Sequence, residues 1–409
     1  MNNIRTVLGS VRSKGSTSLR EIFLLHNIPA PYRVHTFNVL SDELRRRGLK
    51  LSVAFFAANN QDRPSSWTRA LEMARFDYRI WAGFSLRIGR GIVWINPGLM
   101  LRQMFRRPDF LMFGGMWESF TSLWCVSFAP AKHRIGWVEL NVDIPGSQSR
   151  FLSAIKHWCL SRCDFIAVPG EKGLAYLRRY APARAVERAV LLPNIVDESV
   201  FARSVGEEER ARAVQLLKFS EMPGDCLRLI WPARLIPDKG VVEFLCGIDP
   251  NVLKGVQIRI IGDGPLRREV LRVIHDRSLQ RSVLLLDGYV DFDLMPAIYQ
   301  SCDALFLPSL HDPNPLCLIE AMHSSLPVLV SDRLGNRTEA VDNFVNGVAF
   351  DPTDFEDVAR SINWLCSLPA ASRKAAGDHS RRLAQARWGS EASIRRFVDS
   401  VLGPMDDRP

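Results

Sequence analysis

The sequence predicts an α/β protein with two doubly wound parallel sheets, and three observations lead to this prediction. Short apolar runs alternate with longer amphipathic stretches along most of the chain. Turn-forming residues separate these segments, and the alternation restarts after a charged, polar stretch near the middle. The length of 409 residues suits two or three domains. We therefore expect two parallel-sheet domains that face each other across a deep cleft, where ligands bind at the carboxyl ends of strands.

The first predicted domain covers residues 20–202. An apolar run at 21–25 is followed by a proline-rich loop at 27–32, a helical pattern at 36–47 and a strand at 50–57. This strand–loop–helix–strand order is the building unit of a parallel sheet. Further strands of this domain are expected at 110–113, 133–138, 164–168 and 190–192.

A charged and polar segment at 203–226 is the predicted linker region, and the second domain is expected over 227–380. Its strands are predicted at 228–231, 256–261, 283–287, 304–307 and 327–331, with helices between them. The last helical pattern, at 381–403, is predicted to cross back to the N-terminal domain.

Composition excludes several classes of protein. Hydrophobic residues make up 47% and charged residues 24% of the chain, which argues against a disordered chain, a fibrous repeat and a disulfide-bound mini-protein. The eight cysteines are scattered and form no CxxC pair, so we predict buried reduced thiols, no zinc site or redox motif, and a cytoplasmic protein. No cofactor is expected either.

The positive charge lies in the first half. Residues 1–200 contain 28 basic and 15 acidic residues, whereas 201–409 contain 25 and 29. A basic surface suits an anionic membrane face, a phosphate-bearing substrate or nucleic acid. The chain lacks recognisable nucleic-acid-binding motifs, so no nucleic-acid partner is expected. The alternative is that scattered arginines only keep the protein soluble.

Two segments bear on targeting and membrane insertion. Residues 1–19 are basic and lack the long apolar core of a secretory signal, so they are predicted to form a flexible basic arm. The longest apolar stretch, 110–131, contains glycines and Glu118, which favours a buried strand leading into a helix over a membrane span.

Three groups of residues suggest chemistry. Arg234 and Lys239 follow a predicted strand, where two cations can face a diphosphate; the alternative is a solvated loop. The sequence 261–265 (IGDGP) opens a helix with glycines that let backbone approach a ligand, or forms a mere turn. Asp312 and Glu320 flank the start of the next helix, so the pair can hold two hydroxylated parts of one ligand while backbone N–H groups meet an anion.

These groups together resemble the nucleotide-sugar domain of the retaining glycosyltransferases of family 4, which have the GT-B fold of two Rossmann-like domains. The strongest block is Asp312 followed by Glu320-Ala321-Met322 and the strand that starts at Leu326-Pro327-Val328. The blocks at 234–240, 261–265, 288–290, 299–304 and 346–347 follow in the family's order, and 193–201 looks like its domain junction.

The resemblance implies roles for individual residues. Arg234 and Lys239 would hold the diphosphate of a UDP- or GDP-linked sugar and act as electrostatic catalysts. Asp312 would contact the sugar and Glu320 the ribose hydroxyls. The remaining donor-side residues that the resemblance implies are Gly262, Gly264, Tyr289, Asn314, Pro315 and Leu316.

The acceptor side is expected at the strand ends of the N-terminal domain. Its candidate residues are Tyr32, Arg33, Gly115, Glu118 and Glu139. Glu139 stands where many relatives of the family have histidine, so it is also a catalytic candidate; the alternative is a structural carboxylate that pairs with a nearby arginine. The basic domain suits a saccharide or polyprenyl-linked or other lipid-linked acceptor on the inner face of the bacterial cytoplasmic membrane.

Departures from the family pattern keep other functions open. The first glutamate of the family's pair is Asp312, and Pro315 has no N–H to donate. The sequence therefore also admits a catalytically degenerate nucleotide-sugar-binding paralogue that regulates a partner. A third reading is another reaction on the same fold, such as that of an epimerase or a sucrose-type synthase with a soluble acceptor.

Overall fold

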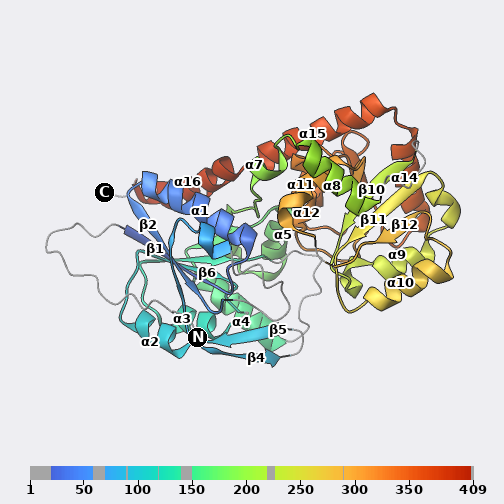
Figure 1. Cartoon of the computed structure of the whole chain (residues 1–409). Coiled ribbons are helices and arrows are strands. Elements are labelled where there is room, and N and C mark those ends of the chain that lie inside the picture. The colour runs from blue at the N-terminus through green and yellow to red at the C-terminus, as the bar shows by residue number, and fades with distance from the viewer. Residues whose placement is uncertain are drawn as a thin grey trace, which may run out of the picture.

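A computed structural model describes residues 20–58, 70–88, 91–117, 119–139, 150–218, 226–288 and 290–406. It confirms two parallel-sheet domains, which lie side by side in Figure 1. The predicted basic arm 1–19 and the predicted site residues Glu118 and Tyr289 lie outside the described residues.

The N-terminal domain contains a parallel sheet of order β3-β2-β1-β6-β7-β8-β9. Its strands are β1 (Arg20–His26), β2 (Leu49–Phe55), β3 (Asp77–Ile80), β6 (Phe110–Gly114), β7 (His133–Trp137), β8 (Phe165–Val168) and β9 (Ala189–Leu191). The chain turns from one half of the sheet to the other between β1 and β6. Both strands end at the edge that faces the C-terminal domain.

The alternation of apolar residues in β1 builds two cores, because neighbouring side chains point to opposite faces. Leu24 packs with α1 (Pro31–Arg46) on one face, and Leu25 packs on the other face with residues of α3 (Phe120–Phe128) and α5 (Glu171–Tyr180). The predicted loop at 27–32 is too long, because Pro31 already occupies the first helical turn, where its missing N–H costs no hydrogen bond. Helices α4 (Arg150–Ser161), α6 (Ala183–Val186) and α7 (Glu198–Phe201) complete this part of the chain.

An antiparallel hairpin and a short helix lie between β3 and β6, and the sequence did not predict them. Strands β4 (Phe84–Ile88) and β5 (Gly91–Ile95) pair with each other, and α2 (Pro97–Met104) follows directly. The buried Asn96 joins these segments, since its side-chain amide donates to the carbonyl oxygens of Trp81 and Phe56, each at 3.0 Å.

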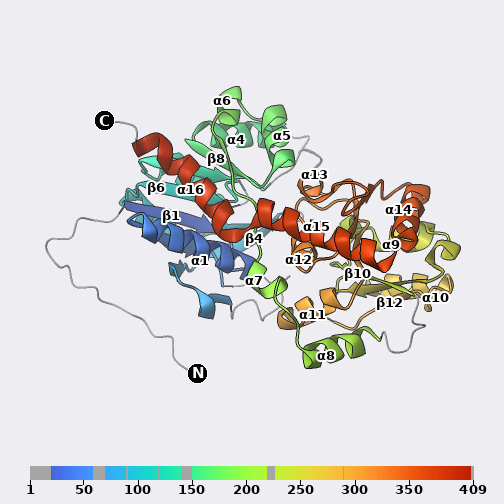
Figure 2. The same cartoon turned by 90° about the horizontal axis from the view of Figure 1, so that it is seen from above.

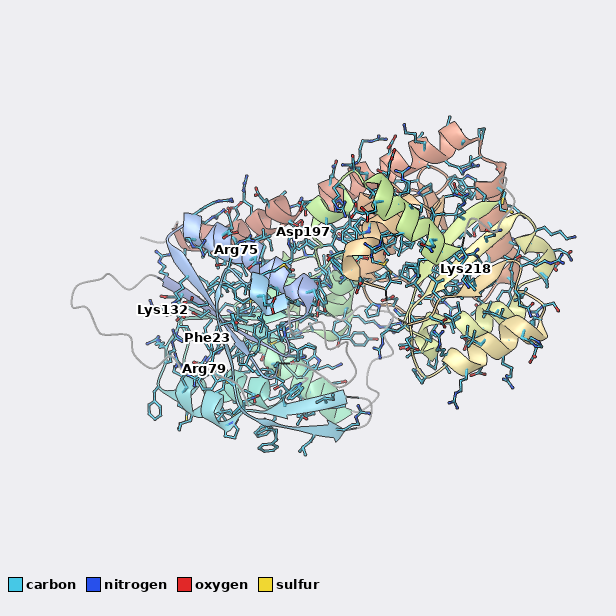
Figure 3. The ribbon with its side chains drawn as sticks, viewed as in Figure 1. Phe23, Arg75, Arg79, Lys132, Asp197 and Lys218 are labelled. Atoms are coloured by element: carbon cyan, nitrogen blue, oxygen red, sulfur yellow. The ribbon has the colours of Figure 1, made fainter. Side chains whose placement is uncertain are left out.

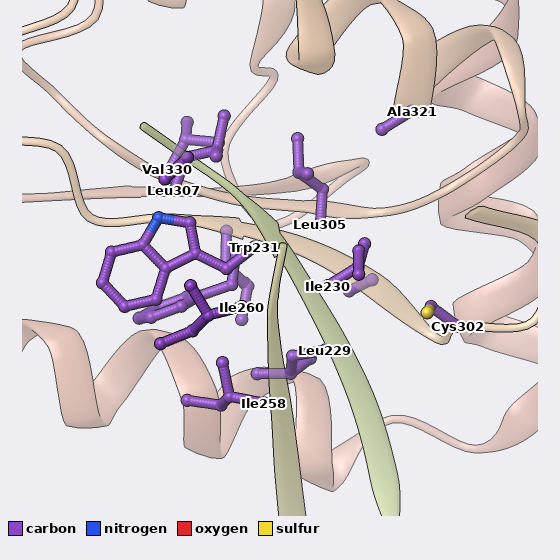
Figure 4. Packing of buried hydrophobic residues seen from close by; sticks show 14 of the residues in the cluster. Leu229, Ile230, Trp231, Ile258, Ile260, Cys302, Leu305, Leu307, Ala321 and Val330 are labelled. Atoms are coloured by element: carbon purple, nitrogen blue, oxygen red, sulfur yellow. The ribbon is translucent and has the colours of Figure 1, made fainter. Parts of the chain in front are cut away.

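The C-terminal domain contains a second parallel sheet, of order β12-β11-β10-β13-β14-β15. Its strands are β10 (Leu227–Pro232), β11 (Val256–Ile261), β12 (Val283–Leu285), β13 (Ala304–Leu307), β14 (Val328–Ser331) and β15 (Gly347–Phe350). Figure 4 shows Trp231 of β10 in the core between this sheet and its helices. All five predicted strands of this domain are present.

The helices of this domain cover both faces of the sheet. They are α9 (Val241–Gly247), α10 (Arg267–Asp276), α11 (Met295–Gln300), α12 (Leu316–His323), α13 (Arg337–Ala340) and α14 (Phe355–Ser367), with the short 3-10 turns η3 (Pro237–Lys239), η4 (Pro250–Leu253) and η5 (Phe292–Leu294). The segment for which a linker was predicted also contains a helix, α8 (Glu207–Leu217), which packs against α11.

The end of the chain returns to the N-terminal domain. Helix α15 (Ala370–Trp388) runs along the C-terminal domain, and after Gly389 helix α16 (Ser390–Asp406) lies against α1, as Figures 1 and 2 show. Phe397 and Val401 of α16 are buried in the same core as Phe37 of α1. The expectation of one helix is therefore wrong in detail: two helices meet at Gly389.

We expect a large stability loss from Gly262→Ala at the end of β11. Gly262 has φ +145°, and a Cβ there would overlap the carbonyl oxygen of Ala233. We expect a loss of about 3 kcal/mol in the free energy of unfolding, because overpacking adds to backbone strain. Urea unfolding of Gly255→Ala is the matched control, since Gly255 has φ +75° but open space around it. Equal losses in the two variants would show that the contact with Ala233 contributes nothing.

Candidate functional site

Each sheet has one point where the order of its strands reverses, and these two points indicate the candidate site. In the C-terminal sheet this point lies between β10 and β13, and in the N-terminal sheet between β1 and β6. Loops that follow strands at such a point form the ligand crevice of doubly wound domains. Arg234 follows β10, the loop 308–315 follows β13, and Gly115 follows β6. Sheet topology and the sequence motifs therefore indicate the same place.

A loop after β10 carries the two predicted cations. Arg234 is exposed and forms no ion pair with any other described residue, whereas Lys239 at the end of η3 pairs with the Asp312 carboxylate. The Lys239 and Asp312 side chains are only 19% and 12% exposed. The loop after β13 holds this loop in place, because the backbone N–H of His311 donates to the Asp238 carbonyl oxygen at 2.8 Å. One cation is thus held by an acid and the other is available to an anion.

The glycine turn after β11 packs directly under this loop. The Leu235 N–H donates to the Asp263 carbonyl oxygen at 3.0 Å, and the Leu266 N–H donates to the Leu235 carbonyl oxygen at 3.1 Å. A Cβ at Gly264 would come within 2.5 Å of that same oxygen. In this structure Gly262 and Gly264 therefore let one backbone segment approach another and so position Arg234. Their predicted contact with a donor stays a prediction.

Glu320 lies in the second turn of α12 and is held by a buried tyrosine. The Tyr299 hydroxyl donates to Glu320 Oε2 at 2.8 Å. Burial raises the pKa of the Glu320 carboxyl to about 7, although the Tyr299 hydrogen bond opposes the shift. Tyr299 is itself fully buried, and burial together with the Glu320 charge raises its pKa. A carboxylate with this environment changes its charge near neutral pH.

The start of α12 is open to a ligand. Pro315 is its N-cap residue, and among the described residues no side chain caps the N–H groups of the first turn, which begins at Leu316. Asn314 follows Asp312, whose Oδ1 accepts from the Asn314 N–H at 3.4 Å. Pro315, which departs from the family pattern, has no N–H to donate, but the residues after it keep theirs.

A narrow hollow lies between the two domains beside this helix start, and its free volume of about 10 Å³ has room for about one water molecule. Both domains line it, and its lining residues are Pro169, Gly170, Gly173, Pro313, Asn314, Gly335, Asn336, Glu339 and Trp388. Three buried acceptor oxygens of that lining lack a hydrogen-bond partner among the described residues: Asn314 Oδ1, Asn336 Oδ1 and Glu339 Oε2. Buried acceptors are usually satisfied, so these three oxygens are open to a hydrogen-bond donor such as a water molecule or a ligand hydroxyl group.

Two hydrogen bonds join the domains at the rim of the hollow. Glu339 Oε1 accepts from the backbone N–H of Glu171, at the start of α5, at 2.7 Å. Lys172 Nζ donates to the Asp332 carbonyl oxygen at 3.1 Å. A Cβ at Gly170 would overlap the Glu339 carboxylate, so a larger residue there would displace that side chain. The second domain thus caps a helix of the first.

The N-terminal side contains a buried ion pair. The Arg33 side chain, only 2% exposed, pairs with the Glu139 carboxylate after β7 and donates to Asn194 Oδ1 at 2.9 Å. The guanidinium also lies over the Trp137 ring, 4.3 Å from its centroid. Burial opposes ionisation of Glu139, but the Arg33 charge outweighs it and keeps the carboxyl pKa below its usual value. Tyr32, beside Arg33, lies in the first turn of α1.

The geometry separates the predicted acceptor-side residues. Arg33 is too deeply buried to meet an acceptor directly, whereas the Glu139 side chain is 43% exposed. Gly115 follows β6 with φ +89°, so the chain turns there in a conformation that favours glycine. In this structure the Glu139 carboxylate pairs with Arg33, as the structural alternative predicted.

His26, at the end of β1, belongs to this cluster and was not predicted. It packs against Phe37 with ring centroids 5.4 Å apart, and burial together with the Arg33 charge lowers its pKa to about 3. No sequence pattern points to His26, because its neighbours come from distant segments of the chain. Asn336 and Glu339 were missed for the same reason. Tyr299 and Asn194 lie in the blocks 299–304 and 193–201, but no role was predicted for them.

His26 makes folding stability dependent on pH. Its pKa is about 3 in the folded state and 6.5 when unfolded, so the unfolded chain binds more protons at acidic pH. His26 therefore does not lower the free energy of unfolding above pH 6.5. As the pH falls from 6.5 toward 4.5, the free energy of unfolding decreases by about 1.4 kcal/mol per pH unit because of His26. Urea unfolding should show a flatter pH profile for His26→Asn than for the wild type. The exposed His275 provides the control variant His275→Asn, and a profile that changes equally in both variants would contradict the prediction.

Cysteines and acids give no sign of a metal site in the described part of the chain. No group of three His, Cys, Asp or Glu side chains there could hold a metal ion. Burial raises the pKa of the Cys159 and Cys163 thiols, as expected for inert cysteines. Cys246 and Cys366 are exposed, so the expectation that the thiols are buried is wrong for these two.

Comparison with known proteins finds similarity to glycosyltransferases over part of the chain. Residues 218–383 match the family described as glycosyl transferases group 1. A segment of 141 residues is 27% identical to an uncharacterized glycosyltransferase of Methanocaldococcus jannaschii and covers 34% of this chain and 35% of that protein. A segment of 174 residues is 25% identical to the UDP-Gal:alpha-D-GlcNAc-diphosphoundecaprenol alpha-1,3-galactosyltransferase of Escherichia coli and covers 42% of this chain and 43% of that protein. The matches thus span less than half of either relative.

Solved structures extend the similarity over both domains. HepE of Anabaena, solved in complex with UDP, superposes with a TM-score of 0.70 at 15% sequence identity, over 95% of this chain and all of that one. Identity this low shows the fold alone. The chain has the GT-B fold.

Proposed function

We propose that the protein is a retaining glycosyltransferase that moves a sugar from a nucleotide diphosphate to a saccharide or lipid-linked saccharide in cell-surface polysaccharide synthesis. One observation carries the proposal. Arg234, Lys239, Asp312 and Glu320 lie where the C-terminal sheet changes direction, beside a hollow with unpartnered buried acceptors. Cations for a diphosphate, a carboxylate for a ribose and acceptors for sugar hydroxyls are thus present together.

The proposed donor is a UDP- or GDP-linked sugar. The E. coli relative is named for transfer from UDP-Gal, and the HepE structure contains UDP, which makes UDP sugars the first choice. Diphosphate oxygens would meet Arg234 and the N–H groups at the start of α12, because both are free of acidic partners. Asp312, now paired with Lys239, would accept from a sugar hydroxyl next to it.

The proposed reaction occurs on one face of the sugar. The bond from the anomeric carbon to the diphosphate oxygen breaks, the acceptor oxygen bonds to that carbon on the same face, and the acceptor proton passes to the leaving phosphate. Arg234 and Lys239 stabilise the negative charge that grows on the phosphate. With two side-chain cations for this purpose, we propose a metal-independent reaction without a cofactor.

Glu139 is the proposed acceptor-side residue. It lies at the carboxyl end of the N-terminal sheet, is partly exposed, and is held as a carboxylate by Arg33. It can accept a hydrogen bond from an acceptor hydroxyl and orient the attacking oxygen. We propose a lipid-linked acceptor and a peripheral position on the inner face of the bacterial cytoplasmic membrane. None of the helices that the structure describes is long and apolar enough to span a bilayer.

The test is a thermal-shift panel of UDP, GDP, ADP and their common sugars with the wild type, Glu320→Ala and Arg234→Ala. A ligand of the folded state raises the melting temperature by mass action. We expect one nucleotide diphosphate to stabilise the wild type and neither variant. Absence of any shift at millimolar concentration would contradict the proposal. Donor binding without transfer or hydrolysis would indicate the degenerate paralogue, and turnover with a soluble sugar alone would indicate a soluble acceptor.

Donor affinity should increase with pH because of Glu320. Its pKa is about 7, and the ionised carboxylate is the better acceptor for two ribose hydroxyls. If binding requires the ionised form, the affinity for a nucleotide sugar rises about tenfold between pH 6 and pH 8. Calorimetric titration measures this rise, and a nucleotide sugar is used because its diphosphate has no proton to lose in that range. Glu320→Gln should bind more weakly and show no such rise, and equal pH profiles would refute the assignment.

A further inference from the structure

Seven large apolar side chains are exposed along one edge of the N-terminal domain. They come from the β4–β5 hairpin, from α2 with its C-cap residue, and from α3, and we call them the apolar edge: Phe84, Leu86, Leu101, Met104, Phe105, Phe120 and Phe128. Phe105 is 83% exposed. Exposed apolar groups that cluster in this way mark an interaction surface.

Contacts between the elements hold the apolar edge together. Helix α3 packs against both α2 and β5, and the Asn96 N–H donates to the Thr121 hydroxyl at 2.8 Å. In the hairpin, Phe84 and Leu86 stand opposite Ile95 and Val93, so one face of the hairpin is apolar, while Trp94 packs inward on the core. Figure 1 shows α2, α3 and the hairpin along the same edge of the domain.

The surroundings of the apolar edge are basic. Residues 78–108 contain six arginines and no acidic residue, and 120–131 contain no charge at all. The Arg79 guanidinium lies 4.2 Å from the centroid of the Trp81 ring, and that of Arg102 lies 5.6 Å from it. Figure 3 shows Arg79 on this edge. Arg107 follows Phe105 and is exposed.

We propose that the apolar edge docks on an anionic lipid bilayer, with its aromatic side chains among the acyl chains and its arginines at the headgroups. The combination of inserted apolar groups and flanking cations is what peripheral membrane binding requires. Arg106 is paired with Glu21, but Arg79, Arg102 and Arg107 form no ion pair with a described residue. A neutral protein partner would not call for these cations. This proposal rests on the proposed function in one respect, the identity of the acceptor.

The position of the apolar edge suits a lipid-linked acceptor. Strand β6 ends at Gly114, on the sheet edge that carries the acceptor candidates, and α3 begins at Phe120 only six residues later. A lipid held in the bilayer under the apolar edge can therefore present its saccharide to Glu139. The bilayer would act as a platform that limits the search for the acceptor to two dimensions.

The experiment is sedimentation of the full chain with vesicles of phosphatidylglycerol and phosphatidylcholine, compared with vesicles of phosphatidylcholine alone. We expect binding to the anionic vesicles that weakens with salt. Phe105→Glu and Arg107→Glu should each reduce the affinity about tenfold or more. The matched controls, Leu271→Glu and Arg268→Glu, change exposed residues of α10 in the other domain and should bind as the wild type does.

Three outcomes would overturn the docking proposal. The wild type could ignore anionic vesicles, Phe105→Glu could bind as well as the wild type, or light scattering could show a dimer that Phe105→Glu removes, which would assign the apolar edge to a second copy of the chain. A thermal-shift measurement with a nucleotide sugar tests the proposed transferase function independently of the docking proposal. We expect Phe105→Glu to keep the donor shift, whereas vesicle binding with no donor shift in any variant would refute the transferase and leave the docking surface standing.

Discussion

Arg234→Ala is expected to reduce kcat/KM for sugar transfer by about two to three orders of magnitude. Arg234 is exposed at the end of β10 and forms no ion pair with a described residue, while Lys239 is already paired with Asp312. The full charge that meets the leaving diphosphate therefore comes mainly from Arg234. Because the negative charge on the phosphate is greater in the transition state than in the bound donor, we expect kcat to fall more than KM rises.

Steady-state kinetics with the nucleotide sugar that gives the thermal shift measures this effect. Arg268→Ala is the matched control, since Arg268 is an exposed arginine on α10 of the same domain. Arg234→Lys should recover part of the rate, because it restores the charge but not the planar pair of donors. A rate for Arg234→Ala within threefold of the wild type would remove Arg234 from the proposed mechanism.

Glu139→Ala is expected to destabilise the fold by about 3 kcal/mol, the lower end of the cost of breaking a buried ion pair. The variant leaves the Arg33 guanidinium, 2% exposed, with Asn194 and Tyr32 as polar partners but with no counter-charge. Arg33→Met should cost less, because the Glu139 carboxylate is 43% exposed and can turn toward water. The two variants differ in cost because the Arg33 charge is buried and the Glu139 charge can reach water.

Urea unfolding of both single variants and of the double variant measures the coupling. The double variant should be more stable than Glu139→Ala alone, since no unpaired charge remains buried. A larger loss for Arg33→Met than for Glu139→Ala would mean that stacking on Trp137 and the bond to Asn194 matter more than the charge.

The sheets of this protein could be predicted because both faces of their strands are buried. Strands such as β11 and β13 are wholly buried, so their sequences are continuous apolar runs. Strand β3 is exposed along its whole length, and β4 exposes Phe84 and Leu86 to solvent. Their sequences therefore carry no burial pattern, and the segment between 70 and 105 was left without elements.

The residues of the candidate site that lie in loops after strands could be predicted from the sequence. Arg234 and Lys239 lie in the loop after β10, Asp312 lies in the loop that leads to α12, and the structure pairs Lys239 with Asp312. Interactions between distant segments could not be predicted, and the Tyr299–Glu320 hydrogen bond is the clearest example. Spacing along the chain shows that Glu320 lies on a helix, but the burial that raises its pKa depends on how that helix packs.

The return of α16 to the first domain has a consequence for synthesis of the chain. Phe397 and Val401 complete a core that begins with Phe37, about 360 residues earlier. Until α16 has left the ribosome, one apolar face of the N-terminal sheet lacks part of its cover. At typical elongation rates this exposure lasts on the order of tens of seconds. The C-terminal domain can fold in that interval, so the domain made first is the one finished last.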